Sequence, residues 1–251
     1  MPRWIGLGFQ DNCSFIIREL SCLHDYIMVI IMFVLFLITY IVFYIIRNLR
    51  FYKYLSEGTF IETIWSIVPA VILVFLVLPS MKVLYIIEDF KNPRLTVKVV
   101  AHQWYWSYIV PLFNNISFFV SSKFYRFFEY DSMIDREFSL APRLLGCSSD
   151  LVLPVRTSCR FLVTSGDVIH SFALPSLGIK VDALPGRINQ IFLNSSRVGQ
   201  YFGQCSEICG SNHSFIPISL KICGLNDYQE VSKSYLFEML IEDKILLSFS
   251  F

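Results

Sequence analysis

Two cysteines and a histidine stand at four-residue intervals late in the sequence, as Cys205, Cys209 and His213. Thiolates are soft metal ligands and imidazole is a borderline one, so this combination indicates copper, zinc or an iron–sulfur centre. A tight loop between two strands would aim all three side chains inward, and Gly203 and Gly210 suit such a loop. The spacing therefore predicts a metal-binding loop.

A site of this kind needs a fourth strong donor, and His170 is the obvious supplier. Spacing alone leaves other interpretations open. Cys205 and Cys209 could be small buried side chains without a function, or they could form a disulfide with each other. With the two histidines they could also hold a zinc ion.

The run from Gly203 to Phe215, GQCSEICGSNHSF, resembles the dinuclear copper motif of cytochrome c oxidase subunit II of the mitochondrial type. Residues 175–190, PSLGIKVDALPGRINQ, resemble the same family. The resemblance begins near Glu62 and continues to about Ile222, apart from a divergent segment around residues 109–128. It implies a copper A centre.

By this resemblance, Cys205 and Cys209 bridge two copper ions, while His170 and His213 each terminate one. The backbone carbonyl of Glu207 completes the coordination of one copper. The Glu207 carboxylate resembles the one that, in the family, reaches a magnesium ion shared with the catalytic subunit I. A carboxylate suits this hard cation, which usually keeps several waters.

One position departs from the family pattern. The family has a methionine thioether three residues after the histidine of the loop, and this chain has Ile216 there. An isoleucine cannot bind copper, and an axial thioether tunes the redox potential of such sites. Either the site assembles with a shifted potential, or Ile216 is a translation choice, because some mitochondrial codes read AUA as methionine.

Two further residues gain a role through the resemblance. Residues 101–108, AHQWYWSY, are rich in aromatic side chains, which usually indicates core packing, but in the family the first tryptophan receives electrons from cytochrome c. That role falls on Trp104. Glu62 opens the second apolar stretch, where an acid at a helix N-terminus is favourable. The resemblance implies that Glu62 lies near the entrance of a proton path into the catalytic subunit.

The docking site for cytochrome c is less well defined by the sequence. Cytochrome c is basic, and complementary charge accelerates encounter. The acids expected just after the aromatic run are replaced by residues 109–111, IVP. Glu129, Asp131 and Asp167 remain as candidates.

The amino-acid composition indicates which classes of protein this chain can belong to. Of the 251 residues, 55% are hydrophobic and 16% are charged, against about 25% charged residues in soluble domains. This excess of apolar side chains needs lipid or a large partner, and a net charge of +1 argues against nucleic acid as the main partner. Seven cysteines are an odd number, so a complete disulfide framework is not implied.

The first half of the chain predicts a membrane hairpin. Residues 1–25 are interrupted by charges and carry no cleavable signal pattern. Residues 26–46 carry no charge and are long enough to cross a hydrocarbon core of about 30 Å as a helix. A basic loop follows, and a second apolar run covers residues 63–81. Because positive loops favour the side from which insertion begins, the loop should face the matrix, or the cytoplasm in a bacterium, and residues 1–25 the outer side.

After residue 90 the pattern changes to short alternating segments separated by turn residues, which indicates a sandwich or barrel. Strands are expected at residues 95–100, 151–155, 159–164, 168–174, 190–194, 199–204 and 216–222. The phenylalanine-rich residues 113–128 should contact another subunit, the membrane surface or the barrel itself.

The predicted fold is a two-helix transmembrane hairpin followed by an all-β cupredoxin-like Greek-key barrel, the barrel type being implied by the resemblance. The expected parts are an N-terminal segment (1–25), the hairpin (26–88), the copper A domain (89–223) and a C-terminal helical tail (224–251).

The resemblance implies that this chain is subunit II of cytochrome c oxidase. It would accept electrons from cytochrome c and pass them to the haem–copper subunit I, which reduces oxygen to water with proton pumping. It would lie in the mitochondrial inner membrane beside other oxidase subunits, with the copper domain in the intermembrane space. The alternative is a membrane-tethered copper or zinc carrier without redox catalysis. A quinol-oxidase partner subunit, which lacks the ligands, is disfavoured by the two cysteines.

Overall fold

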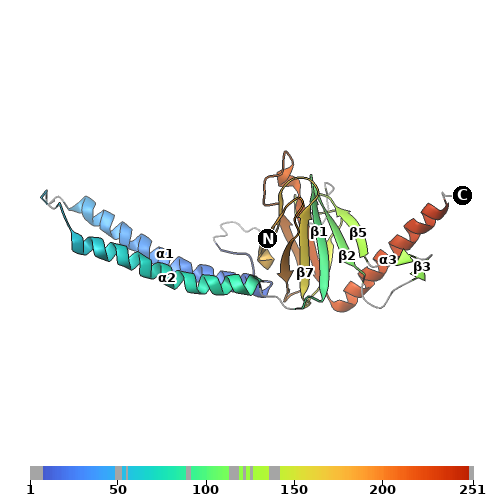
Figure 1. Ribbon diagram of the computed structural model, residues 1–251, viewed down its shortest axis with the longest axis horizontal. Coiled ribbons are helices and arrows are strands. Elements are labelled where there is room, and N and C mark those ends of the chain that lie inside the picture. Colours follow the sequence, from blue (N-terminus) through green and yellow to red (C-terminus); the bar gives the residue numbers. More distant parts are fainter. Residues whose placement is uncertain are drawn as a thin grey trace. The chain divides into compact units, whose positions relative to one another are not determined.

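The computed structural model describes residues 8–48, 53–54, 56–88, 92–112, 119–120, 123–124, 127–135 and 142–248. The chain divides into two compact units: residues 19–87 form one, and residues 1–18 together with 88–251 form the other. Figure 1 shows helices in the first unit and mainly strands in the second.

The helical unit consists of two long apolar helices, α1 (Phe15–Arg47) and α2 (Thr59–Glu88). Their 33 and 30 residues correspond to lengths of about 50 and 45 Å at 1.5 Å per residue, more than the roughly 30 Å of a hydrocarbon core. Both are long and apolar enough to cross a membrane. Pro69 and Pro79 lie inside α2 without ending it, as membrane helices allow.

Helix α1 begins eleven residues before the apolar stretch that predicted it. Ser14 stands at its N-terminus, and the Ser14 hydroxyl accepts a hydrogen bond from the backbone N–H of Ile17 at 3.3 Å. This is the usual capping arrangement for serine. Arg18, Glu19 and Asp25 separate this first turn from the apolar stretch, and within the turn Ile16 and Ile17 are fully buried.

The residues before and within this first turn pack on the β unit. The hydroxyl of Ser14 donates to the carbonyl of Leu177 at 2.7 Å, and the N–H of Ser196 donates to the carbonyl of Cys13 at 2.9 Å. Gly178 has φ +70°, and a Cβ there would lie 3.0 Å from the backbone nitrogen of Ile17. We call residues 11–17 the N-terminal hook.

The β unit contains two main sheets. The five-stranded sheet has the order β10-β7-β1-β2-β5, with β1 and β7 parallel and the other pairs antiparallel. Its strands are β1 (Leu95–His102), β2 (Tyr105–Pro111), β5 (Phe127–Ser132), β7 (Cys159–Ser165) and β10 (Asn189–Leu193).

The three-stranded sheet has the order β11-β12-β6, and the antiparallel hairpins β8-β9 and β3-β4 complete the strands. Their bounds are β6 (Leu151–Pro154), β11 (Gly199–Gln204), β12 (Pro217–Cys223), β8 (His170–Leu174), β9 (Ile179–Ala183), β3 (Phe119–Val120) and β4 (Lys123–Phe124). Two 3-10 turns complete the unit. The turn η1 (Pro175–Leu177) follows β8, and η2 (His213–Phe215) precedes β12.

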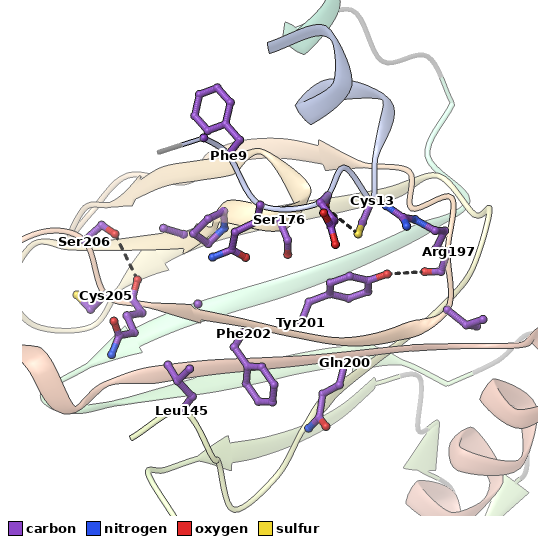
Figure 2. Close-up of a pocket in the computed structure, with 18 residues that line it drawn as sticks. Phe9, Cys13, Leu145, Ser176, Arg197, Gln200, Tyr201, Phe202, Cys205 and Ser206 are labelled. Carbon is purple, nitrogen blue, oxygen red and sulfur yellow. Dashed lines mark hydrogen bonds between the residues drawn. The ribbon is translucent and has the colours of Figure 1, made fainter. Parts of the chain in front are cut away.

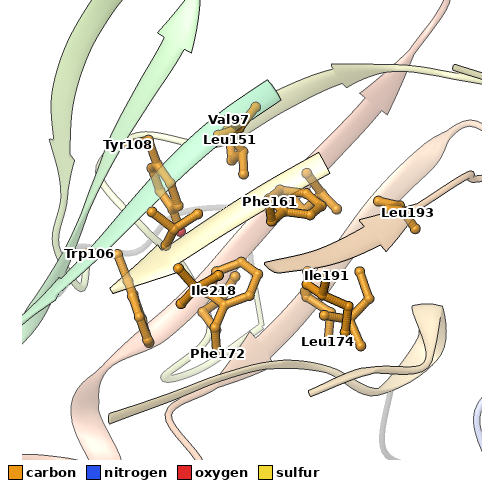
Figure 3. Close-up of a cluster of buried hydrophobic side chains, with 14 of the residues drawn as sticks. Val97, Trp106, Tyr108, Leu151, Phe161, Phe172, Leu174, Ile191, Leu193 and Ile218 are labelled. Atoms are coloured by element: carbon orange, nitrogen blue, oxygen red, sulfur yellow. The ribbon is translucent and has the colours of Figure 1, made fainter. Parts of the chain in front are cut away.

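The core lies between these strands. Figure 3 shows side chains from β1, β2, β7 and β10 meeting side chains from β6, β8 and β12. Trp106, Phe161 and Phe172 are fully buried there, and the Trp106 and Phe172 rings pack edge to face at 5.2 Å. The core therefore ties β8 to the larger sheet.

The predicted strands form, and the structure adds β2, β3, β4, β5 and β9, which the sequence pattern did not predict. Both faces of β2 are covered, so its aromatic residues do not alternate with exposed ones. Strand β8 starts at His170 rather than at residue 168, because the N–H of Val168 is bound by the Asp167 carboxylate in a turn.

The last described element is α3 (Leu225–Ser248), within the range where a helical tail was expected. In the phenylalanine-rich segment, Phe127 is exposed, while Phe128 stacks on Tyr235 of α3 with ring centroids 4.5 Å apart. That part of the segment folds back on its own unit. Phe113 and Phe118 lie outside the described residues.

Candidate metal centre

Three of the predicted ligands form one cluster. The ligand atoms of His170, Cys205 and Cys209 all lie within 4.8 Å of one another, and all three side chains are buried. Nδ1 of His170 is 3.8 Å from Sγ of Cys205, and the two sulfur atoms are 4.0 Å apart. His170, the expected fourth donor, therefore lies next to the thiols, although it is 35 residues from Cys205 in the sequence.

The fourth predicted ligand lies on the other side of Cys209. His213 belongs to η2, is half-buried, and places Nδ1 3.6 Å from Sγ of Cys209. Among the described residues, the cluster of mutually close donors stops at the first three. The four donors thus form an elongated series, with an imidazole beside each sulfur.

Cys205 and Cys209 are free thiols, so the structure does not contain the disulfide that spacing left open. The thiol of Cys205 donates to the backbone carbonyl of Glu207 at 3.3 Å. This carbonyl therefore faces the cluster, as predicted for a backbone ligand, whereas the Glu207 side chain belongs to the exposed part of the loop.

The loop is held by the strands on both sides of it. The N–H of Cys205 donates to the carbonyl of Ile216 at 3.1 Å, and the N–H of Ser206 donates to the carbonyl of Ser171 at 3.0 Å. The second bond joins the cysteine loop to β8, the strand that carries His170. Gly203 permits this approach, because a Cβ at that position would lie 1.9 Å from the carbonyl oxygen of Ala173.

His170 is oriented by an acid. Its Nε2 lies 2.9 Å from Oδ1 of Asp167, so a proton on Nε2 is favoured and Nδ1 is left to face Cys205. Burial acts to raise the pKa of Asp167, but hydrogen bonds from His170 and from the N–H groups of Val168 and Gln103 outweigh it and lower the pKa. Asp167, predicted as a docking acid, is thus also the partner of a predicted metal ligand.

Burial, followed by the nearby Cys205, raises the pKa of the Cys209 thiol to about 12. In the metal-free protein this thiol is protonated at neutral pH. A metal must therefore displace a proton to bind there.

Trp104 lies beside the cluster. It is half-buried in the turn between β1 and β2, and a Cβ on Gly210 would meet its indole at 3.3 Å. Gly210 directly follows Cys209, a predicted ligand. The amide of the neighbouring Gln103 donates to the carbonyl of Cys209 at 2.8 Å. The sequence pattern did not identify Gln103 or Gly210 as partners across this contact.

Other predicted residues lie as follows. Ile216 is 1% exposed, and its aliphatic side chain offers no donor. Glu62 lies in the first turn of α2 and is exposed. Glu129 and Asp131 lie on β5, where Asp131 accepts a 2.6 Å hydrogen bond from Ser107. Their roles in proton transfer and docking stay predictions.

A pocket of about 700 Å³ adjoins the cluster from the side of the N-terminal hook (Figure 2). Phe9, Cys13 and Ser176 line one part of it, and Tyr201 and Cys205 line another. One of the predicted ligands, Cys205, therefore forms part of the wall of this pocket.

Comparison with known proteins identifies the family. A family model described as "Cytochrome C oxidase subunit II, periplasmic domain" matches residues 95–223, and one described as "Cytochrome C oxidase subunit II, transmembrane domain" matches residues 2–83. The chain belongs to the cytochrome c oxidase subunit II family. The predicted resemblance is confirmed, and the chain is a subunit of a cytochrome c oxidase.

Individual relatives support this assignment over most of the chain. "Cytochrome c oxidase subunit 2" of Branchiostoma floridae is 44% identical over 218 residues, which cover 86% of this chain and 90% of the relative. The protein of the same name from Branchiostoma lanceolatum is also 44% identical over 218 residues, covering 86% of both chains.

A solved structure supports the fold of the β unit. The periplasmic domain of subunit II of cytochrome oxidase (CoxB) of Bradyrhizobium japonicum is 35% identical, with a TM-score of 0.52, and the match covers 60% of this chain and 99% of that one. The predicted fold class of this subunit II is confirmed: two apolar helices precede a cupredoxin-like β domain.

Proposed function

We propose that this chain is the electron-accepting subunit of its oxidase. It takes electrons from cytochrome c at a dinuclear copper A centre and delivers them to the haem–copper subunit I, which reduces oxygen to water with proton pumping. The observation that carries the proposal is a pair of free thiols 4.0 Å apart with an imidazole nitrogen beside each sulfur.

The donor set fits two copper ions better than one zinc ion. Two thiolates and two imidazoles are soft to borderline ligands, which suit copper. A single tetrahedral ion with metal–ligand bonds of about 2.0–2.3 Å would need all four donors within about 4 Å of one another. Among the described residues His213 is not part of the close trio, so two metal positions along the series explain the arrangement. Cys205 and Cys209 would bridge them, and His170 and His213 would terminate them.

A dinuclear copper centre supplies one-electron transfer with little rearrangement. The protein contributes the surroundings. Asp167 fixes the orientation of His170, and burial of both thiols excludes water. Ile216 brings no side-chain donor to the position of the family's methionine, so we expect a shifted potential rather than a missing site.

The contacts around the loop support the roles proposed for Trp104 in electron entry and for Glu207 in magnesium binding. Trp104 packs against Gly210 beside Cys209, which suits a residue that receives the electron from cytochrome c. Glu207 and Ile208 are exposed, so both side chains are accessible to a partner. We propose that subunit I covers them and that the Glu207 carboxylate there binds a magnesium ion.

We place the chain in the mitochondrial inner membrane, with the β unit in the intermembrane space. Two helices can span the bilayer, and the basic residues between them favour the matrix side. Glu62, exposed near the start of α2, would lie near the entrance of the proton path. Subunit I and other oxidase subunits are the proposed neighbours, and no nucleic acid is expected.

Metal loading of the full chain in detergent tests the proposal. The expected result is two coppers per chain and rapid reduction by cytochrome c, both lost in Cys209→Ser and kept in Cys159→Ala, a control that removes another buried thiol. A single copper or zinc ion per chain that cytochrome c does not reduce would instead support the alternative function, a membrane-tethered metal carrier.

A further inference from the structure

One residue in the β1-β2 turn is hydrogen-bonded to both segments that carry the metal ligands. The backbone N–H of Gln103 donates to Oδ2 of Asp167 at 2.6 Å. Its side-chain amide donates to the backbone carbonyl of Cys209 at 2.8 Å. These partners lie 64 and 106 residues away in the sequence.

The bond from Gln103 to Asp167 connects the turn to His170. Asp167 uses one carboxylate oxygen for Gln103 and the other for Nε2 of His170, at 2.9 Å. The side chain of His170 is fully buried. A shift of the β1-β2 turn would therefore shift the carboxylate that sets the direction of Nδ1.

The second bond leads directly to a cysteine and to its neighbour. Gly210 has φ +124°, and a Cβ there would lie 3.2 Å from Nε2 of Gln103 and 3.3 Å from Cζ2 of Trp104. Only glycine fits this conformation and this close approach. The cysteine loop, the Gln103 amide and the Trp104 ring are thus packed together at one point.

We propose that Gln103 is a positioning residue, which holds the His170 segment, the Cys209 loop and Trp104 in register with one another. This inference rests on the proposed function, because it assigns the register to a copper centre that accepts electrons beside Trp104. Gln103 itself touches neither metal nor electron donor in this role. It acts through Asp167 and through the carbonyl of Cys209.

A general stabilising role would predict something different. The side chain of Gln103 is largely at the surface, so its removal leaves no cavity in the core. Its bonds end on the backbone of one ligand and on the partner of another. A substitution keeps the backbone bond to Asp167, so loss of the side-chain amide should release the Cys209 loop and change the site while leaving the rest of the fold intact.

The test replaces the amide by a side chain of similar length that cannot donate, Gln103→Met. The matched control is Gln229→Met, in a half-buried position on α3, which follows the end of β12 remote from the loop. Both variants are made in the full chain, loaded with copper, and assembled into the oxidase. Loop order is measured first in the metal-free chain, as amide hydrogen exchange over residues 205–213.

We expect faster exchange over this loop in Gln103→Met than in wild type, an altered copper hyperfine pattern, and electron transfer from cytochrome c slowed about tenfold. Gln229→Met should match wild type in all three measurements.

Exchange, spectrum and rate all equal to wild type in Gln103→Met would overturn the inference. If Gln103→Met fails to fold, Gln103→Asn replaces it, since asparagine keeps the polarity but not the reach; a wild-type spectrum and rate in that variant would overturn the inference equally. Failure of the proposed function looks different, because then the wild-type chain itself does not bind two coppers.

Discussion

At the scale of single residues, the Cys209 thiol must lose its proton before a metal can bind to it. Burial and the neighbouring Cys205 raise the pKa of its thiol to about 12, while the bound form must be a thiolate. Metal and proton therefore compete for one sulfur throughout the neutral range.

The first prediction follows from this competition. Because the Cys209 thiol stays protonated up to about pH 12, the apparent copper affinity of the metal-free chain should rise about tenfold per pH unit for each proton displaced. Competition titrations against a chelator of known pH dependence measure it. An apparent affinity that stays constant across the neutral pH range would contradict the assignment.

Asp167 gives a second prediction, at acid pH. Its pKa is lowered in the fold, so its contribution to stability is present above the ordinary carboxyl pKa and is lost as the pH falls through the lowered value. Wild type should therefore lose stability relative to Asp167→Asn below about pH 4. Urea unfolding of the two metal-free chains at several pH values provides the comparison, and curves that stay parallel would refute it.

Ile216 gives a third prediction. Ile216→Met restores a thioether where the family has one and should lower the midpoint potential, because an added donor stabilises the oxidised metal. Since the swap conserves volume, it should cost less than about 1.5 kcal/mol of unfolding free energy. Ile218→Met, at another buried position of the same segment, is the control. A similar shift there, or none in Ile216→Met, would argue against this role for position 216.

Residue types and spacing were sufficient to predict that His170, Cys205 and Cys209 lie together, because cysteine and histidine are the residue types that soft metal sites require. They were not sufficient for Gln103 and Gly210. A glutamine in a turn and a glycine in a loop are common, and their importance arises only when the turn and the loop meet. Contacts between segments 106 residues apart leave no local pattern.

At the scale of elements, the N-terminal hook and the first turn of α1 belong to the same compact unit as the strands. The hook contacts η1, the turn that follows the His170 strand, and the connection before β11. The sequence placed the helix start too late because hydrophobicity marks the membrane span, whereas the first turn of α1 is defined by the Ser14 cap and by burial of Ile16 and Ile17.

The fourth prediction concerns this contact. Gly178→Ala should destabilise the chain more than Gly186→Ala does. The two glycines share a positive φ of 70° and 75°, and alanine at such a φ costs about 1 kcal/mol. A Cβ at Gly178 also meets Ile17, while a Cβ at Gly186 meets nothing within 4 Å. Thermal unfolding of the full chain in detergent measures the difference, and equal midpoints would show that the hook contributes no stability.

At the scale of the whole molecule, composition and periodicity predicted two classes of structure in one chain. The low charge and the uncharged stretch indicated membrane helices, and the short alternating segments indicated a β domain. They could not predict β2 or β9, since β2 is covered on both faces and β9 depends on pairing with β8. The membrane helices and the thiol cluster could thus be predicted from sequence, whereas the pairing of strands could be seen only in the folded structure.

The central claim is that four side chains hold two copper ions that share one unpaired electron. Electron paramagnetic resonance of the copper-loaded full chain, combined with metal analysis of the same sample, tests it most directly. We predict two coppers per chain and a single mixed-valence signal with hyperfine splitting from both nuclei. One copper per chain with splitting from a single nucleus, or a silent sample containing zinc, would contradict it.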